Sequence, residues 1–225
     1  MEGSPAVPAN TSKVFGVLSP VERFSEILFG LIMTLSITGT MSIVSGGREE
    51  VRIMWLSVLG CNIAWGIIDA ILYLLGIISH RSRGYTLYTL VRQTRDREKA
   101  RAVIEEALPP AIAGVLLPED FESIHHRLAA LPAPPRRRVI TRPDLLGAVG
   151  VFLLVSLSCV PLMIPFLFMH DPLLALRASN AVAIIMLFFG GYSLARYAGG
   201  AKFLTGLVMV VLGVVMVGIT IALGG

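Results

Sequence analysis

Five long apolar runs, separated by polar segments, dominate the hydropathy pattern of this chain. They cover residues 24–45, 53–79, 145–169, 173–195 and 203–223. Each run reaches the length of about 20 residues that a helix needs to cross the hydrocarbon core of a bilayer. The pattern therefore predicts an all-α integral membrane protein with five transmembrane helices.

The polar segments predict how these helices connect. Short segments follow the first, third and fourth runs, so each of these runs forms an antiparallel hairpin with the next one. A long insert separates the second and third helices, and its pattern predicts two helices, at residues 85–108 and 118–131, the first ended by Pro109 and Pro110. Four parts follow: a flexible N-terminal segment 1–23, a transmembrane hairpin 24–79, the helical insert 80–144 and three transmembrane helices 145–225.

The distribution of Lys and Arg predicts the orientation of the chain, because cytoplasmic loops carry an excess of these residues. With the N-terminus in the cytoplasm, 16 of the 19 Lys and Arg residues lie on the cytoplasmic side. The three on the other side are Arg48, Arg52 and Arg177. We therefore expect a multi-pass protein with the N-terminus and the insert cytoplasmic and the C-terminus outside.

Composition narrows the classes of function. The net charge of +4 is first a topology signal in such an apolar chain, so we expect no nucleic-acid partner. The two cysteines both lie inside apolar runs, which excludes a disulfide framework and a CxxC metal site. No motif of the common hydrolases, metalloproteases or nucleotide-binding enzymes occurs, so we expect no enzyme. Two prolines, Pro161 and Pro165, predict a kink in the third run.

Asp69 is a carboxylate in the middle of the second run, "CNIAWGIIDAILYLLGIIS". Such a residue costs roughly 2.5–3.5 kcal/mol on insertion scales and usually faces the bundle interior or a water-filled path. Asn62 lies seven residues earlier on the same helix face, and Thr34, Thr38 and Met33 of the first run are expected at similar depth. We predict that these side chains line a transport path. The alternative interpretation is a protonated Asp69 that forms an interhelical hydrogen bond.

Glu26 is the second candidate, near the cytosolic end of the first run. There it would receive ions and pass them to Asp69, so we add it to the predicted path and metal ligands. The alternative interpretation is an interfacial carboxylate beside Arg23, three residues earlier on the same face.

The insert carries acidic and histidine side chains at helical spacings. They are Glu105, Glu106, Glu119, Glu122, His125 and His126. Spacings of three or four residues place ligands on one helix face, and carboxylates and imidazoles suit Fe²⁺, Mn²⁺ or Zn²⁺. The alternative interpretation is a solvated helix with acids in its first turn. Twelve Lys and Arg against eight Asp and Glu in the insert favour anionic lipid headgroups over a metal.

The last two runs consist of a span rich in small residues, a glycine turn with a basic residue and a Gly-rich span. Their sequence is "ALRASNAVAIIMLFFGGYSLARYAGGAKFLTGLVMVVLGVVMVGITIALG". With "PLMIPFLF" in the third run and the five-run layout, this resembles the VIT/CCC1 family of vacuolar iron transporter-like proteins. The resemblance implies a homodimer that exports cytosolic Fe²⁺ or Mn²⁺ in exchange for protons, with a metal-binding insert. The metal is then the transported ion, and no permanently bound cofactor is expected.

The chain departs from the family pattern in its first two runs. The family's deeper acidic position in the first span is Met33 here, and Asp69 stands where the second span of the family has a metal-facing methionine. Two functions follow. The first is a divalent transition-metal transporter. The alternative is a non-transporting membrane protein whose basic insert binds a protein partner or anionic lipid.

Overall fold

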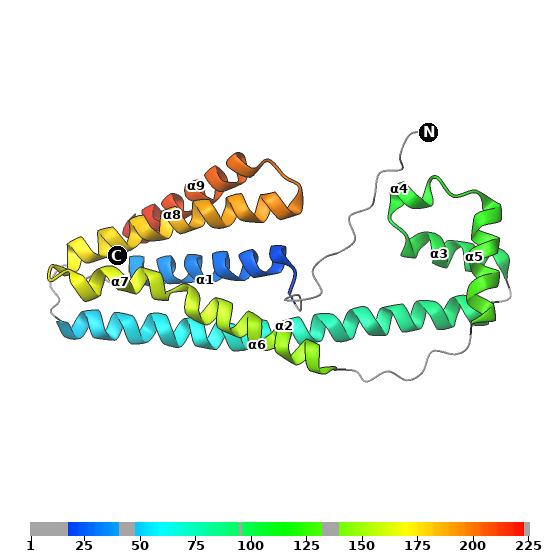
Figure 1. Ribbon diagram of the computed structural model, residues 1–225, viewed down its shortest axis with the longest axis horizontal. Helices are drawn as coiled ribbons and strands as arrows, with labels where there is room; N and C mark the ends of the chain where they lie inside the picture. The colour runs from blue at the N-terminus through cyan, green and yellow to red at the C-terminus, as the bar shows by residue number, and fades with distance from the viewer. Residues whose placement is uncertain (1–17, 41–47, 95, 132–139, 223–225) are drawn as a thin grey trace, which may run out of the picture. The chain divides into compact units, whose positions relative to one another are not determined.

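The computed structural model describes residues 18–40, 48–94, 96–131 and 140–222, and these residues form helices and no strand (Figure 1). The all-helical prediction is therefore confirmed for the described part of the chain. The helices are α1 (Pro20–Thr40), α2 (Arg48–Gln93), α3 (Arg97–Ala107), α4 (Pro110–Ala113), α5 (Pro118–Ala130), α6 (Arg142–Ser158), α7 (Val160–Phe168), α8 (Pro172–Ala198) and α9 (Lys202–Ala222).

Among the described residues, four segments are long and apolar enough to cross a membrane. They are Glu49–Gln93, Arg142–Phe168, Pro172–Ala198 and Lys202–Ile219. These segments coincide with most of the second to fifth predicted runs, which supports a multi-pass membrane protein. Helix α1 matches the first run but does not belong to this set, and residues 41–45 of that run lie outside the described residues. The fifth span and the sidedness of the insert stay predictions.

The chain divides into two compact units. Unit 1 comprises Met1–Tyr73 and Arg142–Gly225, and unit 2 comprises Leu74–Thr141. Helix α2 contributes its first part to unit 1 and its last part to unit 2. It runs past the predicted end at residue 79 to Gln93, because nothing in that stretch stops a helix. The proline-rich linker at residues 132–139 and the N-terminal residues 1–17 lie outside the described residues.

Helix α1 forms the centre of unit 1 and packs against α6, α8 and α9. Its buried leucines join side chains of α7 and α8 in one apolar cluster. The members are Leu28, Leu31, Leu35, Leu162, Ala183 and Leu187. In a bilayer such contacts hold helices together by close packing and not by exclusion of water.

The third predicted run is interrupted at Cys159, between α6 and α7. Pro161 explains the position, because it has no N–H to donate to the preceding turn and its ring crowds that turn. Cys159 keeps near-helical angles, φ −74° and ψ −20°, so the run still counts as one candidate span. Pro165 lies inside α7.

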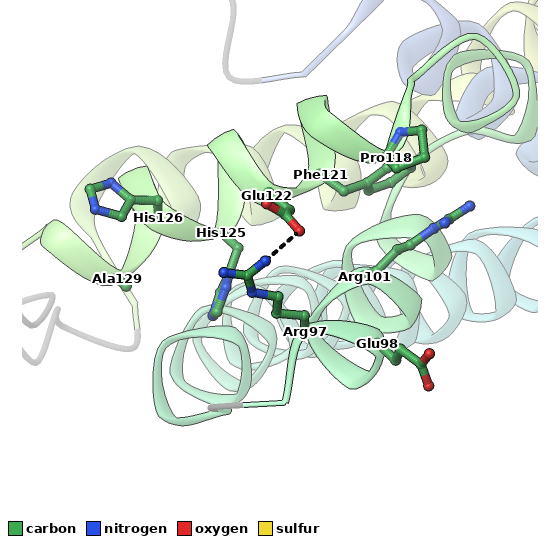
Figure 2. Close-up of a pocket in the computed structure, with 9 residues that line it drawn as sticks. All are labelled: Arg97, Glu98, Arg101, Pro118, Phe121, Glu122, His125, His126 and Ala129. Atoms are coloured by element: carbon green, nitrogen blue, oxygen red, sulfur yellow. Dashed lines mark hydrogen bonds and ion pairs between the residues drawn. The ribbon is translucent and has the colours of Figure 1, made fainter.

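Unit 2 has its own small apolar core, formed by Val91, Ile104 and Phe121. Helices α3 and α5 pack against each other around Phe121, and Arg97 of α3 lies 3.0 Å from Glu122 of α5 (Figure 2). The predicted helix at residues 118–131 is confirmed as α5.

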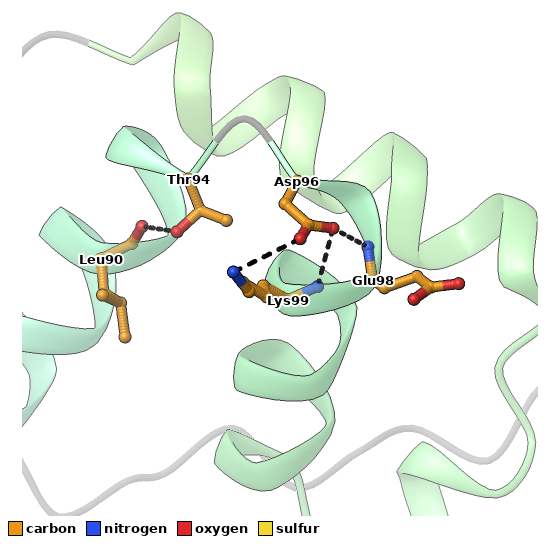
Figure 3. A network of polar contacts seen from close by, with 5 residues as sticks. All are labelled: Leu90, Thr94, Asp96, Glu98 and Lys99. Atoms are coloured by element: carbon orange, nitrogen blue, oxygen red, sulfur yellow. Dashed lines mark hydrogen bonds and ion pairs between the residues drawn. The ribbon is translucent and has the colours of Figure 1, made fainter.

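The single helix predicted over residues 85–108 is wrong, because α2 ends at Gln93 and α3 begins at Arg97. Asp96 is the N-cap of α3, and its carboxylate accepts from two backbone N–H groups of the first turn. The Thr94 hydroxyl donates to a carbonyl of the last turn of α2 at 2.7 Å. Figure 3 shows these contacts among Leu90, Thr94, Asp96, Glu98 and Lys99.

Candidate functional site

The first turn of α1 is fixed by a reciprocal pair of hydrogen bonds between Ser19 and Glu22. The Ser19 N–H donates to the Glu22 carboxylate at 2.6 Å, and the Glu22 N–H donates to the Ser19 hydroxyl at 3.2 Å. This capping box satisfies two N–H groups that the start of a helix leaves unpaired. It starts α1 at Pro20, so the last four residues of the segment predicted as flexible are helical, and it holds the turn that precedes Glu26.

The Glu26 carboxyl of α1 lies within electrostatic range of Asp69 of α2, although 43 positions separate the two residues in the sequence. Asp69 and, to a lesser degree, Glu22 are the carboxylates whose negative charge repels the Glu26 carboxylate. Glu26 and Asp69 are both half-buried. Two carboxylates at such a site repel each other, so the pair favours a cation or a proton between them.

Asp69 lies on a face of α2 that turns toward the other helices. Asn62, Gly66 and Tyr73 share this face, because Asn62, Gly66, Asp69 and Tyr73 follow one another at steps of four, three and four residues. Gly66 packs directly against Ser156 of α6, and the Tyr73 ring packs against Gly147 of the same helix. Asp69 sits between these two contacts, and its Oδ2 atom is buried without a hydrogen-bond partner. Asp69 therefore does not point at lipid.

Asn62 and Thr34 meet further along the same pair of helices. The Asn62 amide donates to the Thr34 hydroxyl at 3.2 Å and to the Val58 carbonyl at 3.0 Å. Asn62 is fully buried, and its Oδ1 atom has no partner among the described residues. The Thr38 hydroxyl donates within its own helix, to the Thr34 carbonyl at 3.0 Å. Met33 is half-buried on α1.

Two residues of this site escaped the sequence interpretation. Ser156 of α6 is buried and its hydroxyl has no partner in the described structure. A lone serine in an apolar run gives no signal of its own, since such residues are common between membrane helices. Glu22 was also missed, although the pattern S-x-x-E before an apolar run predicts a capping box.

The predicted ligands of the insert have other partners in the structure. Glu122 pairs with Arg97, and Glu105 lies 3.9 Å from Arg101. The His125 Nε2 atom lies 3.1 Å from the carbonyl oxygens of both Val91 and Thr94.

The remaining predicted ligands of the insert lie on its surface, where Glu106 and Glu119 are exposed. His126 lines a cavity of about 350 Å³ between α3 and α5, which Figure 2 shows. In the described part of the chain, no group of three or more His, Cys, Asp or Glu side chains is placed to hold a metal ion. The carboxylates of α1 and α2 therefore act, at most, as a pair.

Residues 88–225, more than half of the chain, match the model of the VIT family. The matched range includes the later part of the insert and helices α6 to α9, and with them Ser156. Glu26, Asn62 and Asp69 precede it. No curated protein matches the chain.

Proposed function

The chain belongs to the VIT family, which suggests transport of metal ions across a membrane, and we propose that it exports Fe²⁺ or Mn²⁺ from the cytosol. The ion is the transported substrate, and protons move in the opposite direction. The family resemblance further supports a homodimer in the bilayer, with the insert on the cytosolic side.

The observation that carries this proposal is the carboxylate pair of Glu26 and Asp69 inside a helix bundle. An ionisable residue at membrane depth is costly and is generally retained for a function. A divalent cation neutralises both carboxylates, and its oxygen ligands suit Mn²⁺ and Fe²⁺ better than softer metals. After the cation leaves, protons remove the remaining repulsion, which gives an exchange of metal for protons.

Metal flux into proteoliposomes tests the proposal. We expect saturable Fe²⁺ or Mn²⁺ flux from the wild type, driven by a proton gradient. Asp69→Asn and Glu26→Gln each remove one charged ligand and should lower the flux by about tenfold or more, which corresponds to a loss of about 1.4 kcal/mol. Glu50→Gln is the matched control, because it removes an exposed carboxylate at the start of α2 and leaves the pair intact.

The result that overturns the proposal is a wild type without flux of either ion, or an Asp69→Asn variant that transports as well as the Glu50→Gln control. A wild type that folds but does not transport would favour the second function, in which the insert binds a protein partner or anionic lipid. One feature favours that function. Residues 107–118 carry no charge, and Ile112, Val115 and Leu117 of this stretch are 51%, 78% and 62% exposed.

A further inference from the structure

A second polar site lies two helical turns along α2 from Asp69, where α1, α2 and α6 meet. Asn62 is 0% exposed and Ser156 is 6% exposed. The Asn62 Oδ1 and the Ser156 Oγ both lack a hydrogen-bond partner in the described structure. Together with Asp69 Oδ2, these are the buried side-chain oxygens that the described residues leave unpaired.

The unpaired state of Ser156 is unusual, because the neighbouring hydroxyls all have partners. Ser158, two residues further along α6, donates to the Val155 carbonyl at 2.7 Å. Thr34 of α1 donates in the same way to the Gly30 carbonyl at 2.8 Å. A serine in a helix usually satisfies its hydroxyl with a carbonyl of the preceding turn. Burying a polar atom without a partner costs free energy, so such an atom is expected to have a ligand or a function.

Contacts between the helices place this site in line with the carboxylate pair. The charge of Asp69 acts on the Glu26 carboxyl, and Asn62 donates to Thr34, so α1 and α2 run antiparallel. Ser156 contacts Gly66, which lies between Asn62 and Asp69 on the same face of α2. Because Gly66 has no side chain, the backbone of α2 packs directly against the Ser156 hydroxyl at this level.

We propose that Asn62 Oδ1 and Ser156 Oγ bind the divalent cation at the step that follows the Glu26–Asp69 pair. This inference deepens the proposed transport function and depends on it. Divalent cations of this class take about six oxygen ligands, and one carboxylate pair does not supply them. Neutral amide and hydroxyl oxygens bind a cation more weakly than carboxylates, which allows the ion to move on and leave.

Two serines of α6 give a matched test of this inference. Ser156 and Ser158 are equally buried at 6% exposure, but Ser158 has a partner and Ser156 has none. Ser156→Ala should lower Fe²⁺ or Mn²⁺ flux severalfold without lowering the unfolding temperature, because no hydrogen bond is lost. Ser158→Ala should leave the flux close to that of the wild type. The stabilisation of the detergent-solubilised protein by Mn²⁺ should fall in Ser156→Ala, which measures binding without turnover.

Ser156→Cys supplies a readout that a purely structural role would not change. A sulfur ligand shifts preference toward softer metals, so flux of Cd²⁺ or Zn²⁺ relative to Mn²⁺ should rise in this variant. The inference is wrong if Ser156→Ala and Ser156→Cys match the wild type in rate, metal stabilisation and ion preference while Asp69→Asn is inactive. In that case transport through the carboxylate pair stands. A wild type without flux overturns both proposals together.

Discussion

At the scale of single residues, the contact between Gly66 and Ser156 determines how closely α2 approaches α6. A Cβ atom on residue 66 would lie 2.7 Å from the Ser156 Oγ and 3.0 Å from the Phe152 carbonyl oxygen. We expect Gly66→Ala to lower the free energy of unfolding by about 1–3 kcal/mol, because the added methyl group overpacks this interface. It should also lower metal flux, since the added methyl group would displace the Ser156 hydroxyl. Thermal unfolding in detergent and flux in proteoliposomes measure the two effects.

Gly60 offers the control for this substitution, because it lies on the same helix and a Cβ added there meets nothing within 4 Å. Gly60→Ala should leave flux unchanged and stabilise α2 by up to about 1 kcal/mol, through the higher helix propensity of alanine. Equal stability of the two variants would mean that α2 and α6 do not pack at Gly66 as the structure places them.

At the scale of elements, His125 joins α5 to the end of α2. Its Nε2–H donates to two carbonyls there, those of Val91 and Thr94, which no further helical turn can satisfy. We expect His125→Ala to destabilise unit 2 by about 1–2 kcal/mol. Amide hydrogen exchange should accelerate in α5 and in the last turn of α2.

His126→Ala is the control for that change, because His126 is the next residue of α5 after His125 and is exposed. It should leave hydrogen exchange unchanged. The pair also tests the predicted metal ligands of the insert. If His125 or His126 binds metal, its alanine variant should lose protection from hydrogen exchange only when Fe²⁺ or Mn²⁺ is present. If His125 only bonds the carbonyls at the end of α2, His125→Ala should lose the same protection with and without metal.

The sequence predicted α8 and α9 from their length and apolar content, and α5 from Pro118 at its start and the acidic residues of its first turn. It missed the break between α2 and α3, because residues 92–99 contain no proline or glycine that would end a helix, and the local sign of the break is the Asp96 cap. The site was predicted in part. Asp69 and Glu26 are carboxylates in apolar runs, and their cost makes them visible without a structure. Ser156 could not be predicted, because its importance comes from a neighbour on another helix, Gly66.

At the scale of the whole molecule, the packing of α1 predicts on which side the N-terminus lies. Leu31 and Leu35 of α1 are 0% and 1% exposed at the centre of unit 1, among the candidate spans. The 21 residues of α1 extend about 31 Å, enough for the hydrocarbon core of about 30 Å. We therefore expect α1 to cross the membrane as a fifth span beside the four candidates.

Contacts along α6 give the direction of this fifth span. Leu18, before α1, contacts Gly150, and Gly30 contacts Ser158 further along α6, so the two helices run parallel. Because α6 begins where the insert ends, the N-terminus should lie on the same side as the insert, and the C-terminus on the other side.

In sealed vesicles of one orientation, antibodies should reach tags at the N-terminus and in the insert together, and a C-terminal tag only after the membrane is opened. An N-terminal tag that shares the accessibility of the C-terminal tag would show that α1 does not cross. The register between Glu26 and Asp69 would then be wrong as well, because an α1 outside the membrane cannot place Glu26 beside Asp69.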